Sequence, residues 1–249
     1  MTFPLRTKLR ILSTLATLLS ASAFSATLSF STPAQIADRL PAYSRPHVAG
    51  DFNNDGKLDI ACTESLNDNV FVVLGGAQFN FSTAALVGQS DSPITVASGD
   101  FNKDGFLDLI CLKSGDFTML YGSGDGTFGV GSSYALAGAD WIAVGNFDED
   151  AGGNLDLAVT NGTSTLSIFL GNGNGTFRAP SSLTTGTDPG QVVVADFNND
   201  GHTDLAVVNT GSNTIGVYLG SGTGTFAPAV TYAVDSGTYS LAAADFNRD

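Results

Sequence analysis

Aspartate and asparagine alternate in one short motif, and residues of these types at this spacing can bind a metal ion. The motif reads DFNNDGKLDI at 51–60, DFNKDGFLDL at 100–109 and DFNNDGHTDL at 196–205. Oxygen-bearing side chains stand at positions one, three, five and nine, and position seven can add its backbone carbonyl. Calcium binds six to eight oxygens in flexible geometry, and the glycine at position six permits a sharp turn around the ion. The pattern therefore predicts calcium-binding loops.

The motif is repeated along the whole chain. A looser copy, NFDEDAGGNLDL, occupies 146–157, and a shortened copy, DFNRD, occupies 245–249. The five copies therefore recur with a period of about 49 residues, which marks a repeat architecture. The looser copy begins with asparagine instead of aspartate and has two additional residues before its last aspartate.

A second, glycine-rich landmark falls between the motifs. It reads YGSGDGTF at 121–128, LGNGNGTF at 170–177 and LGSGTGTF at 219–226, with a degenerate version, LGGAQFNF, at 74–81. Glycine, asparagine and aspartate accept the positive φ of tight hairpin turns. Two turns per period imply several short strands in each repeat. The most regular repeat predicts strands at 191–195, 204–209, 214–219 and 227–233.

Four short antiparallel strands at this period predict an all-β fold, a β-propeller of four-stranded blades. The 30 glycines and the evenly spaced turn residues agree with this fold class. We expect one propeller over 24–249, with repeats starting near positions 45, 94, 140, 190 and 239. Residues 27–40 have the spacing of an outer strand, and 245–249 stop inside a motif. The sequence thus predicts about four complete blades plus two partial ones, in a truncated ring.

The first residues differ from the rest of the chain. Three basic residues precede an apolar stretch at 11–19, and small residues follow around Ala23. This order is typical of a secretory signal peptide, and the apolar stretch is shorter than the roughly 20 residues that a membrane span needs. We therefore predict a signal peptide at 1–23 and a secreted or cell-surface protein.

The chain is strongly acidic. It has 24 Asp and Glu against 10 Lys and Arg, a formal net charge of −14. Nucleic acids and anionic membranes need basic residues, so we expect neither nucleic-acid binding nor membrane insertion. Much of the acid lies in the repeated motif, where neighbouring carboxylates repel by roughly 1 to 4 kcal/mol per pair. This crowding favours a cation as the partner of the loops.

Two other interpretations of the motif deserve comparison. The side chains could form Asx turns on their own backbone without any metal. An EF-hand, in contrast, needs a glutamate at position twelve between two helices, whereas the twelfth residues here are Cys62, Cys111 and Val207. We therefore reject the EF-hand. The two cysteines stand where the later repeats have Val159 and Val207, so we expect small buried side chains rather than a disulfide.

These motifs resemble the FG-GAP or VCBS-type repeat family, whose best-known members form the β-propeller head of integrin α subunits. The resemblance implies Ca²⁺ in a hairpin loop between the first two strands of a blade. Only Phe128-Gly129 spells the FG element, and no Gly-Ala-Pro occurs. Carried over residue by residue, the ligands are the side chains of Asp51, Asn53, Asp55, Asp59, Asp100, Asn102, Asp104, Asp108, Asp196, Asn198, Asp200 and Asp204, with the carbonyls of Lys57, Phe106 and His202. The third loop would contribute Asn146, Asp148, Asp150 and Asp156.

Signals for catalysis are weak. His47 and His202 are the only histidines, and neither a GxSxG nor an HExxH motif occurs. Trp141 could stack a sugar, but beside a first strand it is expected in the core between blades. We therefore predict a monomeric, non-enzymatic recognition or adhesion module for a protein or glycan ligand. The alternative is a non-catalytic or partial propeller domain of a larger secreted polysaccharide-degrading enzyme.

Overall fold

The computed structural model describes residues 44–64, 69–76, 85–89, 93–113, 115–162 and 164–244. The predicted signal peptide at 1–23, the predicted outer strand at 27–40 and the last motif copy at 245–249 lie outside the described residues. In the part that is described, no helix is long and apolar enough to cross a bilayer.

The described residues form four antiparallel sheets of four strands each, and within each sheet every strand pairs with its neighbours in sequence. We number the sheets in chain order as blades 1 to 4, so that blade 1 contains β1 to β4 and blade 4 contains β13 to β16. This arrangement confirms the predicted all-β propeller of four-stranded units. The strands are β1 Ser44–Gly50, β2 Asp59–Glu64, β3 Asn69–Val73, β4 Ala85–Gln89, β5 Pro93–Gly99, β6 Asp108–Lys113, β7 Asp116–Gly122, β8 Phe128–Ala135, β9 Ala139–Gly145, β10 Asp156–Asn161, β11 Thr165–Phe169, β12 Ser181–Thr184, β13 Pro189–Ala195, β14 Asp204–Asn209, β15 Thr214–Tyr218 and β16 Val230–Ala233.

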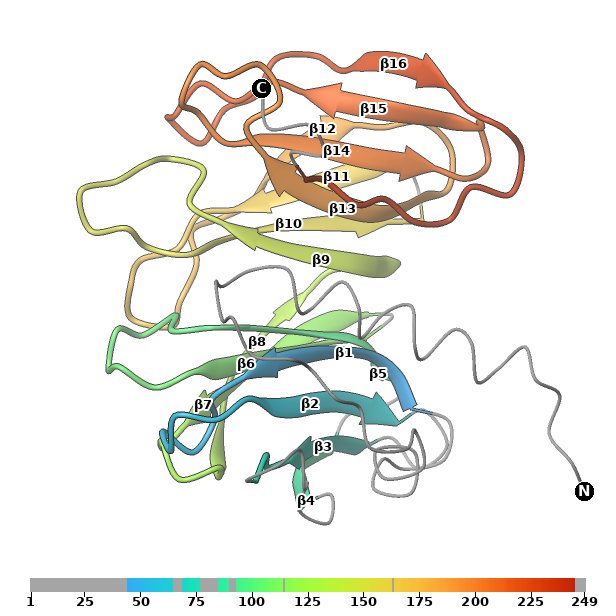
Figure 1. The fold of residues 1–249 in the computed structure, drawn as a ribbon. Helices are drawn as coiled ribbons and strands as arrows, with labels where there is room; N and C mark the ends of the chain where they lie inside the picture. The colour runs from blue at the N-terminus through green and yellow to red at the C-terminus, as the bar shows by residue number, and fades with distance from the viewer. Residues whose placement is uncertain are drawn as a thin grey trace, which may run out of the picture.

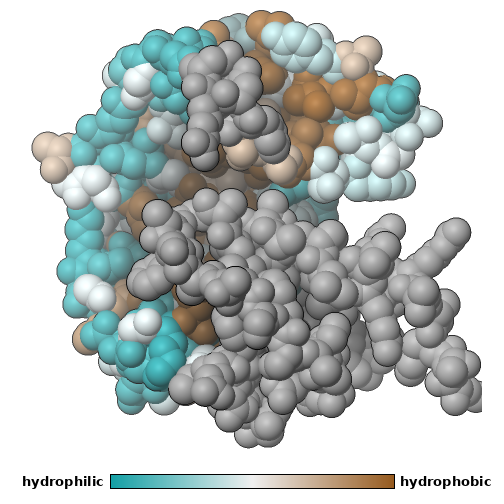
Figure 2. Space-filling view, in the orientation of Figure 1, coloured by the Kyte–Doolittle hydropathy of each residue, from teal (hydrophilic) through white to brown (hydrophobic). Residues whose placement is uncertain are grey.

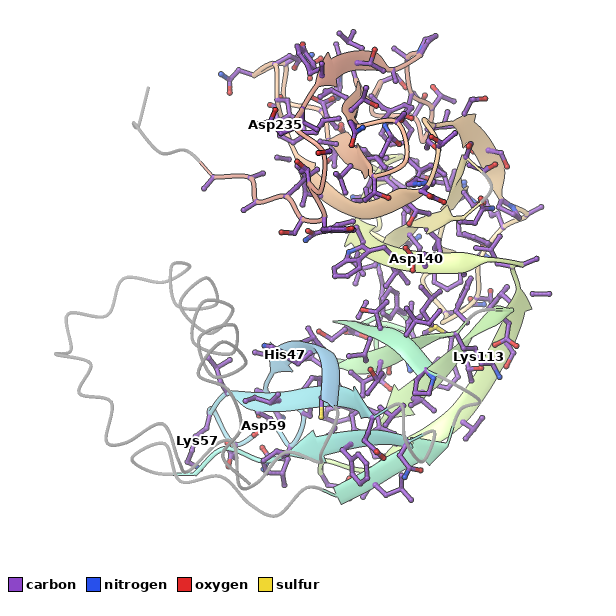
Figure 3. All side chains as sticks on the ribbon, turned by 90° about the vertical axis from the view of Figure 1, so that its right-hand side faces the viewer. His47, Lys57, Asp59, Lys113, Asp140 and Asp235 are labelled. Atoms are coloured by element: carbon purple, nitrogen blue, oxygen red, sulfur yellow. The ribbon has the colours of Figure 1, made fainter. Side chains whose placement is uncertain are left out.

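The first strands of the blades, β1, β5, β9 and β13, lie next to one another. The four blades therefore follow one another in an arc around the side that these strands line (Figure 1, Figure 3). Of the outermost strands, β16 is exposed along its whole length, and β8 and β12 are exposed at most of their residues. This is the radial order of a propeller, in which a blade is covered on its two faces by its neighbours.

The second strands are buried, three of them from end to end and β6 at all residues but its last, which explains their long apolar sequences. All six residues of β2, β10 and β14 are buried. A strand covered on both faces has no need to alternate polar and apolar residues. Cys62 on β2 and Cys111 on β6 are both buried, which confirms the prediction of small core side chains.

Three apolar cores hold the arc together, one at each junction between blades. The first joins residues such as Phe52 of blade 1 and Leu109 of blade 2. The second is centred on Phe117 of blade 2, and the third includes Tyr218 of blade 4. Trp141 is partly buried against this third core, as predicted for an aromatic side chain beside a first strand. Each blade thus depends on its neighbours for much of its apolar burial.

Candidate metal loops

The repeated acidic motif forms the loop between the first and second strands of each blade. The loops lie at the left edge of the molecule in Figure 1, and the same edge is hydrophilic in Figure 2. Positive φ angles make the sharp turn, at Lys103 (60°) and then at Gly105 (90°) in blade 2. No atom lies within 4 Å of a Cβ added to Gly105, so the backbone conformation, and not crowding, calls for glycine there.

The side chains of the regular loops accept hydrogen bonds from their own backbone. In blade 2, Asp100 accepts from the N–H of Asp104 (3.2 Å) through Oδ1 and from the N–H of Gly105 (3.0 Å) through Oδ2. Asn102 accepts from the N–H of Asp104 (2.9 Å), and Asp104 accepts from the N–H of Phe106 (2.9 Å). The loops of blades 1 and 4 repeat this pattern. The structure therefore contains the Asx turns that the sequence allowed as an alternative interpretation of the motif.

These turns are compatible with the predicted donor set. A carboxylate oxygen has about two acceptor sites, so Asp100 and Asp104 still have lone pairs after these bonds. Within the described ranges, no three His, Cys, Asp or Glu side chains come together as a group that could hold a metal. The predicted set also uses the Asn102 amide oxygen and the Phe106 carbonyl. Its chemistry, with oxygen as the only ligand atom, suits calcium.

The last aspartate of each motif, predicted as a ligand, also has a structural role. Asp108 is fully buried, and its two oxygens accept from the N–H groups of Phe101 (3.0 Å) and Gly122 (3.0 Å). Gly122 is the last residue of β7 and leads into the glycine-rich turn, so the carboxylate connects the loop to the start of that turn. The other three blades have the same pair of bonds, from Phe52 and Gly75 to Asp59, from Phe147 and Gly171 to Asp156, and from Phe197 and Gly220 to Asp204.

The glycine whose N–H bonds the buried carboxylate, Gly122 in blade 2, is a site residue that the sequence did not single out. A Cβ at Gly122 would clash with the backbone carbonyl oxygen of Leu107, and the corresponding glycines of the other blades meet the same obstacle. The signal was present in the sequence, because a glycine stands at this position even in the degenerate copy at 74–81. The sequence alone explains this glycine only as part of a tight hairpin turn.

In three of the four blades, burial disfavours the ionised form of the last aspartate of the motif. Burial, with smaller contributions from the charges of Asp104 and Asp100, raises the pKa of Asp108 to about 6. Burial likewise raises the pKa of Asp59 and of Asp156. Positive charge placed in these loops would favour the ionised form of the buried carboxylate. The electrostatics therefore favour a cation as the ligand.

The third loop differs from the others. Arg178 donates to Asp148 Oδ2 (3.1 Å), and Asp150 accepts from the backbone N–H (2.8 Å) and the side-chain amide of Asn154. The Oδ1 atoms of Asn146 and Asp148 are buried without a hydrogen-bond partner. Two buried oxygens of this kind could serve as ligand atoms for a cation. The insertion therefore gives this loop a different donor set, part of which already contacts an arginine.

The glycine-rich turns also dock onto the loop of the preceding blade. Gly175 of blade 3 donates to the carbonyl of Phe101 of blade 2 (2.9 Å), and Phe177 packs edge-on against Phe101 with ring centroids 6.0 Å apart. A side-chain contact also connects loops of neighbouring blades. His202 of blade 4 forms a hydrogen bond with Glu149 of blade 3 (2.9 Å), and this hydrogen bond raises the pKa of His202. The loops and turns thus form a continuous belt across blades.

A propeller with an acidic loop between the first two strands of each blade is a known class of repeat protein. The model of the FG-GAP-like repeat matches residues 51–111, 150–207 and 196–249, more than half of the chain. The chain belongs to the FG-GAP-like repeat family, which confirms the resemblance drawn from the motifs.

Solved structures share the fold at low sequence identity. An Agrocybe aegerita lectin that recognises non-reducing terminal N-acetylglucosamine has a TM-score of 0.54 and 19% identity, over 78% of this chain and 54% of its own. BBS1N, in complex with ARL6DN, has a TM-score of 0.59 and 11% identity, over 83% and 61%. A putative 6-phosphogluconolactonase from Bacteroides fragilis has 0.58 and 18%, over 78% and 56%. The chain therefore spans between half and two thirds of these proteins. No curated protein sequence matches it.

Proposed function

We propose that the chain is an exported, calcium-binding propeller module that recognises a protein or glycan and does not catalyse a reaction. The observation that carries the proposal is the repeated loop, which places residues with carboxylate, amide and carbonyl oxygens at one edge of three regular blades. Burial of a further carboxylate beneath each loop adds negative charge that a divalent cation would offset. Two of the similar structures, the lectin and the complex of BBS1N with ARL6DN, are named for recognition or for a partner.

In each regular loop, the residues at positions one, three and five would hold the ion, with the carbonyl of position seven. In blade 2 these are Asp100, Asn102, Asp104 and Phe106. Bound calcium would supply charge neutralisation and rigidity and no reaction chemistry. With a dissociation constant near 0.1 mM and about 1 mM external calcium, one site would add roughly 1.4 kcal/mol to the free energy of unfolding. Several sites would then match much of the net stability of a domain.

Calcium titration calorimetry and thermal unfolding test this proposal. We expect heats of binding for several sites and a melting temperature that falls by several degrees in EDTA. The double variant Asp100→Asn/Asp104→Asn should lose one site, because two anionic ligands of one loop become neutral. Asp235→Asn, which removes an exposed charge outside the loops, is the matched control and should keep every site. Absence of calcium heats, together with identical melts in calcium and EDTA, would sink the proposal.

Recognition needs a separate measurement. A glycan and protein array probed with the secreted, processed chain should show binding that weakens in EDTA, because the loops on which the blades dock would lose their cation. Binding that is equally strong with and without EDTA would show that recognition does not depend on bound calcium. Turnover of an arrayed glycan would contradict the proposal that the chain does not catalyse a reaction.

A further inference from the structure

A hollow of about 370 Å³ lies where the inner strands begin, at the opposite end of these strands from the acidic loops. Its polar and aromatic lining comes from β9, β13 and the segments around them, and Asp140 is labelled on β9 in Figure 3. A hollow of this size lies within the range of small-molecule sites. The lining residues that carry the argument are Asp140, Trp141, Asp188, Gln191, Thr210 and Tyr239.

Irregular strand starts build this hollow. The pairing of β13 with β14 shifts register between Pro189 and Val192, and the pairing of β10 with β9 shifts opposite Asp140. Such bulges redirect side chains out of the regular alternation of a sheet. Asp188 has a φ of 49°, and its carbonyl accepts from both the N–H and the hydroxyl of Thr210 (2.9 Å each). The backbone is thus fixed in an unusual conformation beside the hollow.

The hollow is negatively charged. Desolvation, and then the charge of Asp188, raise the pKa of Asp140. Among the described residues that line the hollow, none is a lysine, arginine or histidine. Two carboxylates that repel each other beside a hollow of this kind favour a ligand that carries positive charge.

Aromatic side chains give the hollow a second type of contact. Trp141 is half-buried, packed on one side against the core between blades 3 and 4. Tyr239 is 74% exposed on the segment after β16, which is held to β13 by the hydrogen bond from the Leu241 N–H to Gln191 Oε1 (2.8 Å). Aromatic faces attract cations and pack against the apolar faces of sugar rings. The volume leaves room for a ring and not only for a single ammonium group.

We propose that this hollow binds an amino sugar with a free ammonium group, through the carboxylates of Asp140 and Asp188 and the aromatic side chains of Trp141 and Tyr239. The inference rests on the proposed recognition function and names its ligand class as a glycan that contains unacetylated hexosamine. The Gln191 amide group would donate hydrogen bonds to the sugar hydroxyls, and the Thr210 hydroxyl oxygen would accept one from them. The ammonium group would be the feature that distinguishes this ligand from a neutral glycan.

The fluorescence of Trp141, the only tryptophan of the chain, reports directly on this hollow. The full chain in calcium buffer at about pH 6.5, where a sugar amine is largely protonated, is titrated with a glucosamine trisaccharide. Its fully N-acetylated counterpart is the matched ligand, because acetylation removes the charge and keeps the ring. We expect the free amine to bind at least about tenfold more tightly.

Variants locate the site. Asp140→Asn/Asp188→Asn should weaken binding of the glucosamine trisaccharide at least about tenfold and abolish the preference for the free amine. Asp235→Asn removes an exposed charge that does not line the hollow and should change nothing (Figure 3). Unfolding midpoints of both variants check that they fold.

Several outcomes overturn the inference. Equal affinity for the two trisaccharides would leave glycan recognition standing and refute the ammonium site. Undiminished binding by the double variant would place the sugar elsewhere. Tighter binding of a lysine peptide than of either sugar would assign the hollow to a protein ligand. Failure of the calcium titration, in contrast, would refute the proposed calcium sites and leave this sugar preference intact.

Discussion

The same phenylalanine occurs in the loop of all four blades, yet it is buried in three of them and exposed in the last. Phe52, Phe101 and Phe147 are 1%, 3% and 1% exposed, whereas Phe197 is 41% exposed. Each buried ring packs edge-on against a phenylalanine from the glycine-rich turn of the next blade. The neighbouring blade therefore completes the burial of the loop phenylalanine, which its own blade covers only in part.

The two ends of the arc expose complementary parts of this junction. In the interior, Leu107 packs into the core between blades 1 and 2, but Leu58, its counterpart in blade 1, is 61% exposed. A Cβ at Gly50 would clash with Leu107 of the next blade, while Ala195 stands at the corresponding position of blade 4. Each blade thus has one packing surface toward the preceding blade and one toward the following blade. Its contribution to the free energy of unfolding depends on whether both surfaces are buried.

The largest expected effect breaks this comparison directly. Phe101→Ala should lower the free energy of unfolding by about 3–5 kcal/mol, because it empties a packed junction. Phe197→Ala should lower it by less than about 1 kcal/mol, because the ring is already partly in water. Urea unfolding of the two variants beside the native chain gives both values.

A conservative pair controls for the change in shape. Phe101→Leu keeps most of the apolar volume and should cost clearly less than Phe101→Ala. If Phe197→Ala costs as much as Phe101→Ala, the loop phenylalanine is stabilised within its own blade, and the account of the junctions is wrong.

A smaller effect is expected at two glycines that share a positive φ but differ in their neighbours. A Cβ at Gly175 (φ 77°) would clash with the ring of Tyr121 in blade 2, whereas a Cβ at Gly201 (φ 88°) would meet nothing within 4 Å. Gly175→Ala should cost about 2–4 kcal/mol, from backbone strain and overpacking together. Gly201→Ala should cost only the strain, about 1 kcal/mol. Equal losses in urea unfolding would show that Tyr121 can move aside.

Local pattern predicted the fold well, because each strand and loop follows from chemistry within one repeat. The strands predicted at 204–209 and 214–219 are β14 Asp204–Asn209 and β15 Thr214–Tyr218. The burial of Cys62 followed from the valines at the same position of later repeats. A repeat thus reports its own secondary structure several times over.

Contacts between separate segments were not predictable in the same way. Sequence spacing placed Asp108 among the ligands but could not show that both of its oxygens accept backbone N–H groups, one of them from Gly122 at the end of β7. The arginine beside Asp148 was equally invisible, because Arg178 comes from a turn 30 residues further along the chain. Such pairings depend on how strands are placed side by side, which composition does not encode.

The smallest expected effect concerns pH and the buried carboxylate beneath a covered loop. Burial raises the pKa of Asp108 to about 6 in the folded chain, from an ordinary value of 3.8. Between these values the folded state binds a proton that the unfolded state does not, so this stabilisation is present at low pH and is lost as the pH rises through 6. In EDTA, Asp108 should add about 1 kcal/mol to the free energy of unfolding when the pH falls from 7 to 5.

The variant Asp108→Asn isolates that contribution, because asparagine cannot titrate. Burial lowers the pKa of His47, so acidification below its ordinary value of 6.5 acts in the opposite direction by protonating the unfolded state first. His47 is present in both proteins, and its effect cancels when the pH dependence of Asp108→Asn is subtracted from that of the native chain. The difference should therefore grow toward pH 5. A difference that is constant between pH 7 and 5 would mean that Asp108 stays ionised beneath its loop, stabilised by its two N–H donors despite complete burial.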